Sequence, residues 1–305
     1  MQKVLVDFLG KYKESVDREI AAEIEKRLEE AKEISPHLVP IIEAMKELSV
    51  GGKRLRAMLT ILGYEIAGGE VNDEVIKAAT AMELFHLGLL IHDDVMDQDD
   101  LRRGIKTIHM RYQDRHFGET IAINAGDETF GWSVEILSRL NLNPALLNKA
   151  MAVWGKYFTR VGYGQILDVM TDQRKNTSDE EVLKVLAIKS GEYSCVLPLL
   201  LGATLGGGRK ELLDNLEKYG MELGWVFQLR DDWLAGYGDP AKTGKPVGND
   251  SREGKRTFVT MYGKEKAEQA IAKHMMIGKD LLRGFSSKYW ELMEGLLAWM
   301  GTREN

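Results

Sequence analysis

Apolar side chains recur along this chain every three to four residues, which is the spacing of an amphipathic helix. Clean alternation of apolar and polar residues, which marks a strand, is almost absent. The stretch 74–98 is apolar nearly all round, as in a helix buried inside a protein. We predict an all-α fold in which one domain spans residues 1–305, with helices over 17–34, 53–67, 74–98, 119–139, 144–171, 180–205, 209–238, 263–284 and 287–300.

Two polar segments interrupt this pattern. In DQRKNTSDEEV, Ser178 and Glu181 have the spacing of a capping box for the helix that follows. Residues 239–256, GDPAKTGKPVGNDSREGK, are rich in glycine and lysine. Loops of that length inside compact domains are usually functional lids or disordered segments, and these glycines and lysines suit closure over phosphate.

Composition narrows the class of protein. With 44% hydrophobic and 29% charged residues, the 305-residue chain is globular, and its net charge of −6 argues against a general nucleic-acid surface. Its one cysteine, Cys195, excludes an internal disulfide framework and lies in an apolar stretch, so we expect a buried inert thiol. The charged N-terminus is no signal peptide, and we see no apolar run of about 18 residues. We expect a cytoplasmic protein without a transmembrane segment.

Two acidic clusters follow apolar helical runs, in LIHDDVMDQDDLRRG and FQLRDDWLAGYGD. Asp93 and Asp97 lie one turn apart on one helix face, while Gln228, Asp231 and Asp232 project together. A solvated helix end is the plain alternative. However, like charges one turn apart cost roughly 0.2–0.5 kcal/mol even when exposed. Carboxylate-only ligands suit Mg²⁺, which shares its coordination with water and substrate phosphates.

Basic residues accompany the acidic clusters. Lys53 and Arg56 of GGKRLR stand at a helix start, where phosphate binds readily. Each basic residue alone is an ordinary surface charge. Together they indicate one or two anionic ligands bridged to the carboxylates by metal. The other members of the set are Arg102 and Arg103 after the first acidic cluster, Lys189 beside Ser190, and Lys245 and Lys255 on the glycine-rich loop.

The motifs occur together in an order that is highly specific. From about residue 45 to 260 they are GGKRLR, ELFHLGLLIHDDVMDQDDLRRG, AGD, GQILD, KSGEY, FQLRDD, and GKPVGND with REGKRT. The chain therefore resembles the trans-polyprenyl diphosphate synthases, closest to the short-chain geranylgeranyl diphosphate synthases of archaeal type. The resemblance implies an isoprenoid-synthase helical bundle around a deep central cavity, a homodimer, and three Mg²⁺ ions. It also implies isopentenyl diphosphate and an allylic diphosphate (dimethylallyl, geranyl or farnesyl) as substrates.

The resemblance also implies roles for individual residues. Asp93, Asp97 and Asp231 would be metal ligands, supported by Asp94 and Asp232, although Ala235 stands where a third aspartate of the second motif is usual. His86 would bind substrate, although a lone histidine at such a place is more often a core residue. The allylic diphosphate would contact Arg102, Lys189, Gln228 and Lys245, and isopentenyl diphosphate would contact Lys53, Arg56, His86 and Arg103. Ser190 and Lys255 would also bind substrate.

Product length is expected to depend on three residues that precede the first acidic cluster. In the family, such positions form the floor of the tunnel that receives the growing chain. Leu89 and Phe85 precede Asp93 by four and eight residues, so Phe85 lies about 12 Å before it, while the tiny Gly88 argues against an early stop. We expect geranylgeranyl diphosphate as product. A C25 or longer product and farnesyl diphosphate are the alternatives, and the alternative role of Phe85 is packing against a neighbouring helix.

Two other classes of protein use similar motifs. A terpene cyclase also uses DDxxD and Mg²⁺, but it has no need of a second diphosphate site such as Lys53, Arg56 and Arg103 would form. A non-catalytic subunit of a heteromeric synthase tends to lose its aspartates, whereas both Asp-Asp pairs stand here. Release of pyrophosphate only in the presence of both substrates would distinguish the synthase.

Overall fold

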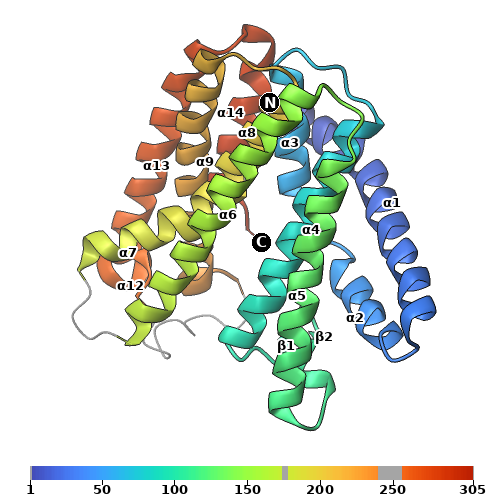
Figure 1. The fold of residues 1–305 in the computed structure, drawn as a ribbon. Coiled ribbons are helices and arrows are strands. Elements are labelled where there is room, and N and C mark those ends of the chain that lie inside the picture. The colour runs from blue at the N-terminus through green and yellow to red at the C-terminus, as the bar shows by residue number, and fades with distance from the viewer. Residues whose placement is uncertain (1, 174–177, 240–255, 305) are drawn as a thin grey trace. The chain divides into compact units, whose positions relative to one another are not determined.

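The structure of the chain, a computed structural model, describes residues 2–173, 178–239 and 256–304. Its contacts form two compact units. The N-terminal unit comprises Leu9–Ile61 and Val71–Asn143, and the C-terminal unit comprises Met1–Phe8, Leu62–Glu70 and Pro144–Asn305. Apart from one pair of two-residue strands, every regular element in these described ranges is helical (Figure 1). The predicted all-α class is confirmed, and the single domain stays a prediction.

The N-terminal unit is built on α4 (Asp73–Met96) and α5 (Arg115–Ser138), which lie side by side (Figure 1). Asn72 begins α4, because its side-chain oxygen accepts hydrogen bonds from the N–H groups of Glu74 at 3.0 Å and Val75 at 3.2 Å. The other elements with residues in this unit are α1 (Gln2–Ile34), α2 (Val39–Ser49), α3 (Leu55–Ile66), β1 (Leu101–Arg102), β2 (Ile105–Lys106) and the 3₁₀ helix η1 (His109–Arg111).

Small residues let α4 and α5 approach each other closely. A Cβ atom added to Gly88 of α4 would lie 2.8 Å from the backbone oxygen of Gly126 on α5. One added to Gly126 would lie 2.2 Å from the ring of His92. Two turns before His92, the fully buried ring of Phe85 packs against Phe130 with centroids 5.4 Å apart. This contact fixes the helix that carries the first acidic cluster.

The C-terminal unit contains a π-helical segment, η2 (Ala187–Val196), that packs against α9 (Lys210–Tyr237). A Cβ atom on Gly224 of α9 would lie 2.5 Å from the Cα atom of Gly191, so the two backbones touch. π-Helical turns are rare and occur frequently at functional sites. The remaining helices are α6 (Pro144–Gln173), α7 (Asp179–Leu186), α8 (Leu197–Leu205), α12 (Phe258–Tyr262), α13 (Lys264–Leu281), η3 (Leu282–Gly284), η4 (Ser287–Tyr289) and α14 (Trp290–Thr302).

Most predicted helices are confirmed to within a few residues. The first begins at Gln2 rather than at residue 17, and α2, α12 and the β1–β2 pair were not predicted. The capping box is confirmed, because Ser178 Oγ accepts from the Glu181 N–H at 3.3 Å and Glu181 Oε2 accepts from the Ser178 N–H at 3.0 Å. Of the predicted loop 239–256, residues 240–255 lie outside the described residues. Cys195 is buried, as expected.

Within the described residues, two helical stretches are long and apolar enough, by length and composition, to cross a membrane, contrary to the expectation from sequence. They are Asp73–Asp97 and Asp179–Leu205. In the structure, 72% and 67% of their most apolar windows are buried. The core helix of a folded protein passes the same test, so these stretches are weak evidence for a membrane span.

Candidate active site

The first acidic cluster lies at the C-terminal end of α4. The Asp97 N–H donates to the Asp93 backbone oxygen at 2.8 Å, which places the half-buried Asp93 and the exposed Asp97 one turn apart. Gln98 adopts a left-handed φ of 58°, and the Asp99 N–H then donates to the Asp94 backbone oxygen at 3.0 Å. This is the closure that ends a helix at a left-handed residue. It leaves Asp93 and Asp97 on one face of the last turn.

Asp94 turns the other way and is only 1% exposed. The Nε and Nη2 atoms of Arg102 each lie 2.6 Å from Asp94 Oδ1. Burial raises the pKa of Asp94, while the Arg102 charge opposes that shift. Asp94 therefore holds Arg102 directly, and its predicted contact with a metal stays a prediction.

Arg102 and Arg103 lie on a small antiparallel hairpin, in which Arg102 pairs with Ile105. Arg103 and Gly104 form its two-residue turn with φ angles of 53° and 79°, as the tight turns of hairpins require. A Cβ atom on Gly52 would lie 3.4 Å from the terminal guanidinium nitrogens of Arg103. The turn thus lays Arg103 over the backbone of GGKRLR, which the sequence analysis did not anticipate.

A group of cations surrounds His86, which is half-buried on α4 two turns before Asp93. The pKa of His86 is well below its ordinary value, first because of burial and then because of the charges of Arg56, Arg103, Arg102 and Arg54. The imidazole is therefore neutral near pH 7. The N-terminal unit thus brings His86, Arg56 and Arg103 together, and the exposed Lys53 lies in the same segment as Arg56.

The second acidic cluster lies near the C-terminal end of α9. Asp232 is buried, with Oδ1 accepting from Gln228 Nε2 at 2.8 Å and Oδ2 accepting from the Phe258 N–H at 3.0 Å. Its carboxylate thus joins α9 to the start of α12. Asp231 is half-buried and pairs with Arg303, whose Nη2 atom lies 2.5 Å from Asp231 Oδ1. Sequence analysis missed Arg303 because it lies 72 residues away with no motif to mark it.

Lys189 and Ser190 belong to the π-helical segment η2. Lys189 Nζ lies 2.5 Å from Asp168 Oδ2, which is the aspartate of GQILD on α6. A Cβ atom on Gly164 of that motif would lie 2.8 Å from the Lys189 backbone nitrogen. The glycine and the aspartate of GQILD therefore set the position of Lys189. The predicted substrate contacts Lys245 and Lys255 lie outside the described residues.

The predicted chain-length residues face different surroundings. Leu89 is half-buried, as is Asp93 one turn later. Phe85 is fully buried against Phe130, and Gly88 faces α5. A substitution at Gly88 must therefore disturb helix packing whatever else it does. The roles of these residues in product length stay predictions.

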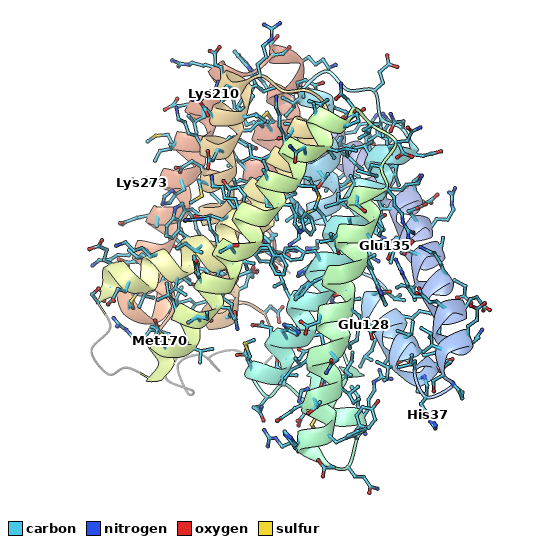
Figure 2. All side chains as sticks on the ribbon, in the orientation of Figure 1. His37, Glu128, Glu135, Met170, Lys210 and Lys273 are labelled. Carbon is cyan, nitrogen blue, oxygen red and sulfur yellow. The ribbon has the colours of Figure 1, made fainter. Side chains whose placement is uncertain are left out.

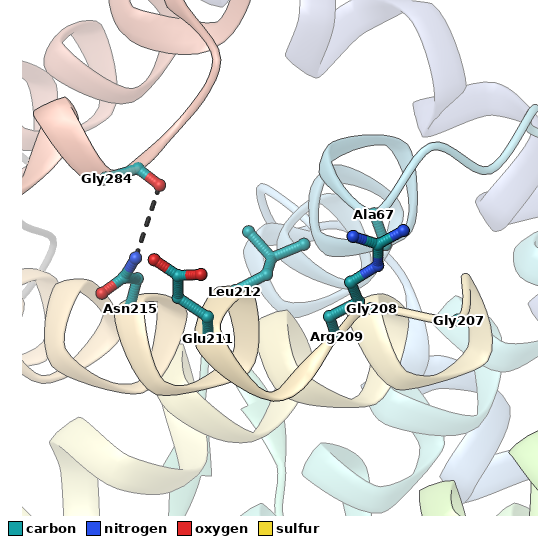
Figure 3. A pocket seen from close by; sticks show the side chains of 8 residues that line it. All are labelled: Ala67, Gly207, Gly208, Arg209, Glu211, Leu212, Asn215 and Gly284. Atoms are coloured by element: carbon teal, nitrogen blue, oxygen red, sulfur yellow. Dashed lines mark hydrogen bonds between the residues drawn. The ribbon is translucent and has the colours of Figure 1, made fainter.

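Two surface cavities lie apart from these clusters. One of about 540 Å³ in the C-terminal unit is crossed by a 3.4 Å hydrogen bond from Asn215 Nδ2 to the Gly284 backbone oxygen (Figure 3). A second, of about 410 Å³, lies in the N-terminal unit beside Glu128 and Glu135, which project from α5 (Figure 2). Neither is lined by a predicted site residue. The first is lined by Ala67, Gly207, Gly208, Arg209, Glu211, Leu212, Asn215 and Gly284.

Comparisons with known proteins agree with this arrangement of motifs. The model of the polyprenyl synthetase family matches residues 39–281, which is most of the chain. The chain therefore belongs to the polyprenyl synthetase family, and as an enzyme it is a prenyltransferase.

Similar proteins are named as isoprenyl or geranylgeranyl diphosphate synthases. The chain is 34% identical over 266 residues to the short chain isoprenyl diphosphate synthase of Methanothermobacter thermautotrophicus, covering 87% of this chain and 77% of that protein. It is 37% identical over 219 residues to the geranylgeranyl diphosphate synthase of Methanosarcina mazei, covering 72% and 65%. Among solved structures, the geranylgeranyl pyrophosphate synthase of Corynebacterium glutamicum, complexed with isoprenyl diphosphate and magnesium, matches with a TM-score of 0.88. That match has 28% identity and covers 98% and 99% of the two chains.

Proposed function

We propose that this enzyme condenses isopentenyl diphosphate with an allylic diphosphate, head to tail, to make geranylgeranyl diphosphate. The relatives of that name and the absence of a bulky side chain at Gly88 support this product. A C25 product is the runner-up, because the next bulky group on the helix beyond Gly88 is Phe85, about 12 Å before Asp93. The cytoplasmic location stays a prediction.

One observation carries the proposal: a single compact unit contains both an acidic turn and a separate cationic group, and α4 carries the acidic turn at its end and His86, on which the cations act, two turns earlier. Asp93 and Asp97 form the turn, and Arg56 and Arg103 act on a neutral His86 two turns earlier. Crowded arginine charges are costly in a half-buried place unless an anion binds there. Two chemically distinct sites suit two diphosphate substrates, of which one is bound through metal and the other through cations.

The acidic residues fit Mg²⁺ by their chemistry. Asp93, Asp97 and Asp231 offer oxygen atoms alone, which a hard cation prefers. In the described part of the chain, no group of three or more acidic, histidine or cysteine side chains could hold a metal by itself. The ions, three by resemblance, would therefore keep water and share their coordination with substrate phosphate, as Mg²⁺ commonly does. When bound, Mg²⁺ supplies neutralisation of the charge that develops on the leaving diphosphate.

Side chains of the protein orient the two reactants relative to each other. Arg102, fixed by Asp94, and Lys189, fixed by Asp168, direct positive charge at the allylic diphosphate as its carbon–oxygen bond breaks. The second diphosphate is held by Arg56, Arg103 and the neutral His86, which can donate one hydrogen bond. The double bond of isopentenyl diphosphate then attacks the allylic carbon, and a proton is lost to the departing pyrophosphate. No protein nucleophile takes part.

A pyrophosphate-release assay separates this function from its alternatives. We expect release when both diphosphates and Mg²⁺ are present, and loss of release after chelation. A terpene cyclase would release pyrophosphate from the allylic diphosphate alone. A non-catalytic subunit would release none, so either result would refute the proposal.

Separate binding of the second substrate has its own test. Lys53→Ala and Arg103→Ala should raise KM for isopentenyl diphosphate far more than KM for the allylic substrate, because each removes a cation from only one site. Steady-state kinetics with each substrate varied in turn measures both constants. Equal increases in the two KM values would contradict the assignment.

A homodimer is supported by an apolar stripe on α6. Tyr163 and Ile166 are 60% and 59% exposed, and Leu167 and Met170 lie on the same face one turn apart. Exposed apolar stripes of this kind commonly mark protein–protein contacts. Light scattering after gel filtration should give twice the chain mass, and Ile166→Asp should shift it toward the monomer. A monomeric wild-type protein at micromolar concentration would refute the dimer.

A further inference from the structure

Arg54 is the middle basic residue of GGKRLR and has no role in the proposed chemistry. Only 9% of its side chain is exposed, and its guanidinium joins three other helices. Nε donates to Asp17 Oδ1 of α1 at 2.6 Å, and Nη2 donates to the Ser49 backbone oxygen of α2 at 2.8 Å. Nη1 lies 3.5 Å from Glu83 Oε2 of α4. The charge of Arg54 is thus directed into the protein.

The backbone at Arg54 is unusual. Its φ is 51°, in the left-handed region that residues other than glycine rarely adopt, and it follows Gly51 and Gly52 with φ angles of 82° and 86°. A residue other than glycine keeps such a backbone conformation only where several contacts with the surrounding structure hold it there. The three contacts of the Arg54 guanidinium supply that constraint.

Glu83 extends the constraint to α3. It is buried, and its Oε1 atom accepts a hydrogen bond from the Ala57 N–H at 3.0 Å, in the first turn of that helix. The carboxylate that faces Arg54 therefore also fixes the turn that carries Arg56. On the other side of Arg54, hydrogen bonds from Lys13 and Arg54 outweigh burial and keep the pKa of Asp17 below its ordinary value. Arg54 is thus held between the carboxylates of Asp17 and Glu83.

We propose that Arg54, Asp17 and Glu83 form a positioning unit that fixes the left-handed turn of GGKRLR. The turn aims Lys53 and Arg56 at isopentenyl diphosphate, while Arg54 itself touches no substrate. This inference rests on the proposed function, because it assigns the unit to the second diphosphate site. Its loss should affect that substrate selectively, since none of the contacts described above reaches the acidic turn of α4 or the aspartates of α9.

The test compares Arg54→Gln, Arg54→Lys and Asp17→Asn with the wild-type enzyme. Arg139→Gln serves as control, because Arg139 forms an exposed ion pair with Glu135 on α5. We expect Arg54→Gln to raise KM for isopentenyl diphosphate by roughly 10–100-fold, the range seen when a supporting residue is removed. KM for the allylic substrate and kcat should stay near the wild-type values. Calorimetric titration of isopentenyl diphosphate alone should show the same loss of affinity.

The other two variants separate positioning from direct contact. Arg54→Lys keeps the positive charge but loses the planar guanidinium, so it should not restore the wild-type KM for isopentenyl diphosphate. Asp17→Asn should raise the same KM, whereas an Arg54 that bound substrate itself would be released by this change and would bind at least as well. If Arg54→Gln does not fold, Arg54→Lys and Asp17→Asn decide the question.

Three outcomes would overturn the inference. They are rescue by lysine, an Asp17→Asn variant with unchanged affinity, and parallel changes for both substrates. If the wild-type enzyme is active and any one of these results is found, the positioning unit is refuted while the proposed function stands. A wild-type enzyme that makes no prenyl product would refute the proposed function and this inference together.

Discussion

Gly88 offers a sharp test of how α4 is held. Replacing it by alanine adds one methyl group at the contact with α5. That Cβ atom would lie 2.2 Å from Thr129 Oγ1, 2.6 Å from Phe130 Cε1 and 2.8 Å from the Gly126 backbone oxygen. Thr129 is itself fixed, because its hydroxyl donates to the same backbone oxygen at 2.7 Å. The neighbours therefore cannot yield without moving the helix.

The expected magnitude follows from two opposing terms. Alanine in place of glycine inside a helix normally stabilises by roughly 0.5–1 kcal/mol. Forcing an extra group into a packed contact costs about 1–3 kcal/mol. We expect the second term to win, with a net loss of about 1–2 kcal/mol for Gly88→Ala. Gly131 on α5 has nothing within 4 Å of an added Cβ, so Gly131→Ala should instead gain roughly 0.5–1 kcal/mol.

Urea unfolding of the two variants beside the wild type measures both free energies of unfolding. The predicted result is a difference of about 2 kcal/mol between Gly88→Ala and Gly131→Ala, with Gly131→Ala the more stable. Equal stabilisation by both substitutions would refute the packing argument. The same argument makes Gly88→Phe an unsuitable probe of product length, because its effect on packing would obscure any effect on a tunnel.

Three further predictions concern the site. Asp93→Ala or Asp231→Ala should lower kcat by orders of magnitude with folding intact, and steady-state kinetics that show only a raised KM would contradict their roles. Phe85→Ala should lengthen the products, because it removes the bulky group beyond Leu89, and an unchanged chromatogram would place the tunnel floor elsewhere. Because the folded-state pKa of His86 is lowered, the unfolded chain binds its proton first, so stability should fall as pH drops below about 6.5. Thermal midpoints should show this fall reduced in His86→Gln, and identical pH slopes would refute it.

The sequence predicts well whatever depends on local periodicity. The apolar spacing placed α4 and α9, and the capping box at Ser178 was readable from two residues. The helix end at Gln98 and the hairpin turn at Arg103 were not, because Gln98 stands where a glycine is usual and no alternating strand pattern flanks Arg103 and Gly104. Their conformations come from contacts with distant parts of the chain.

The candidate site shows the same division. The motifs indicated which charged residues belong to the site, but not which protein groups each of them binds. Asp94 and Asp232 look like members of equal acidic pairs in sequence, yet each is buried and bound to protein groups. Arg54 looks like one more cation of a basic motif, yet its partners come from three other helices. Such roles depend on packing between segments, which a single sequence does not display.

The most direct test of the central claim is mass spectrometry of the products made from isopentenyl diphosphate and each allylic starter. The account predicts chains extended by five-carbon units, ending mainly at C20, with one pyrophosphate released for each unit added. Products should require both substrates and Mg²⁺. Release of pyrophosphate without an extended chain, or no product from any starter, would contradict it.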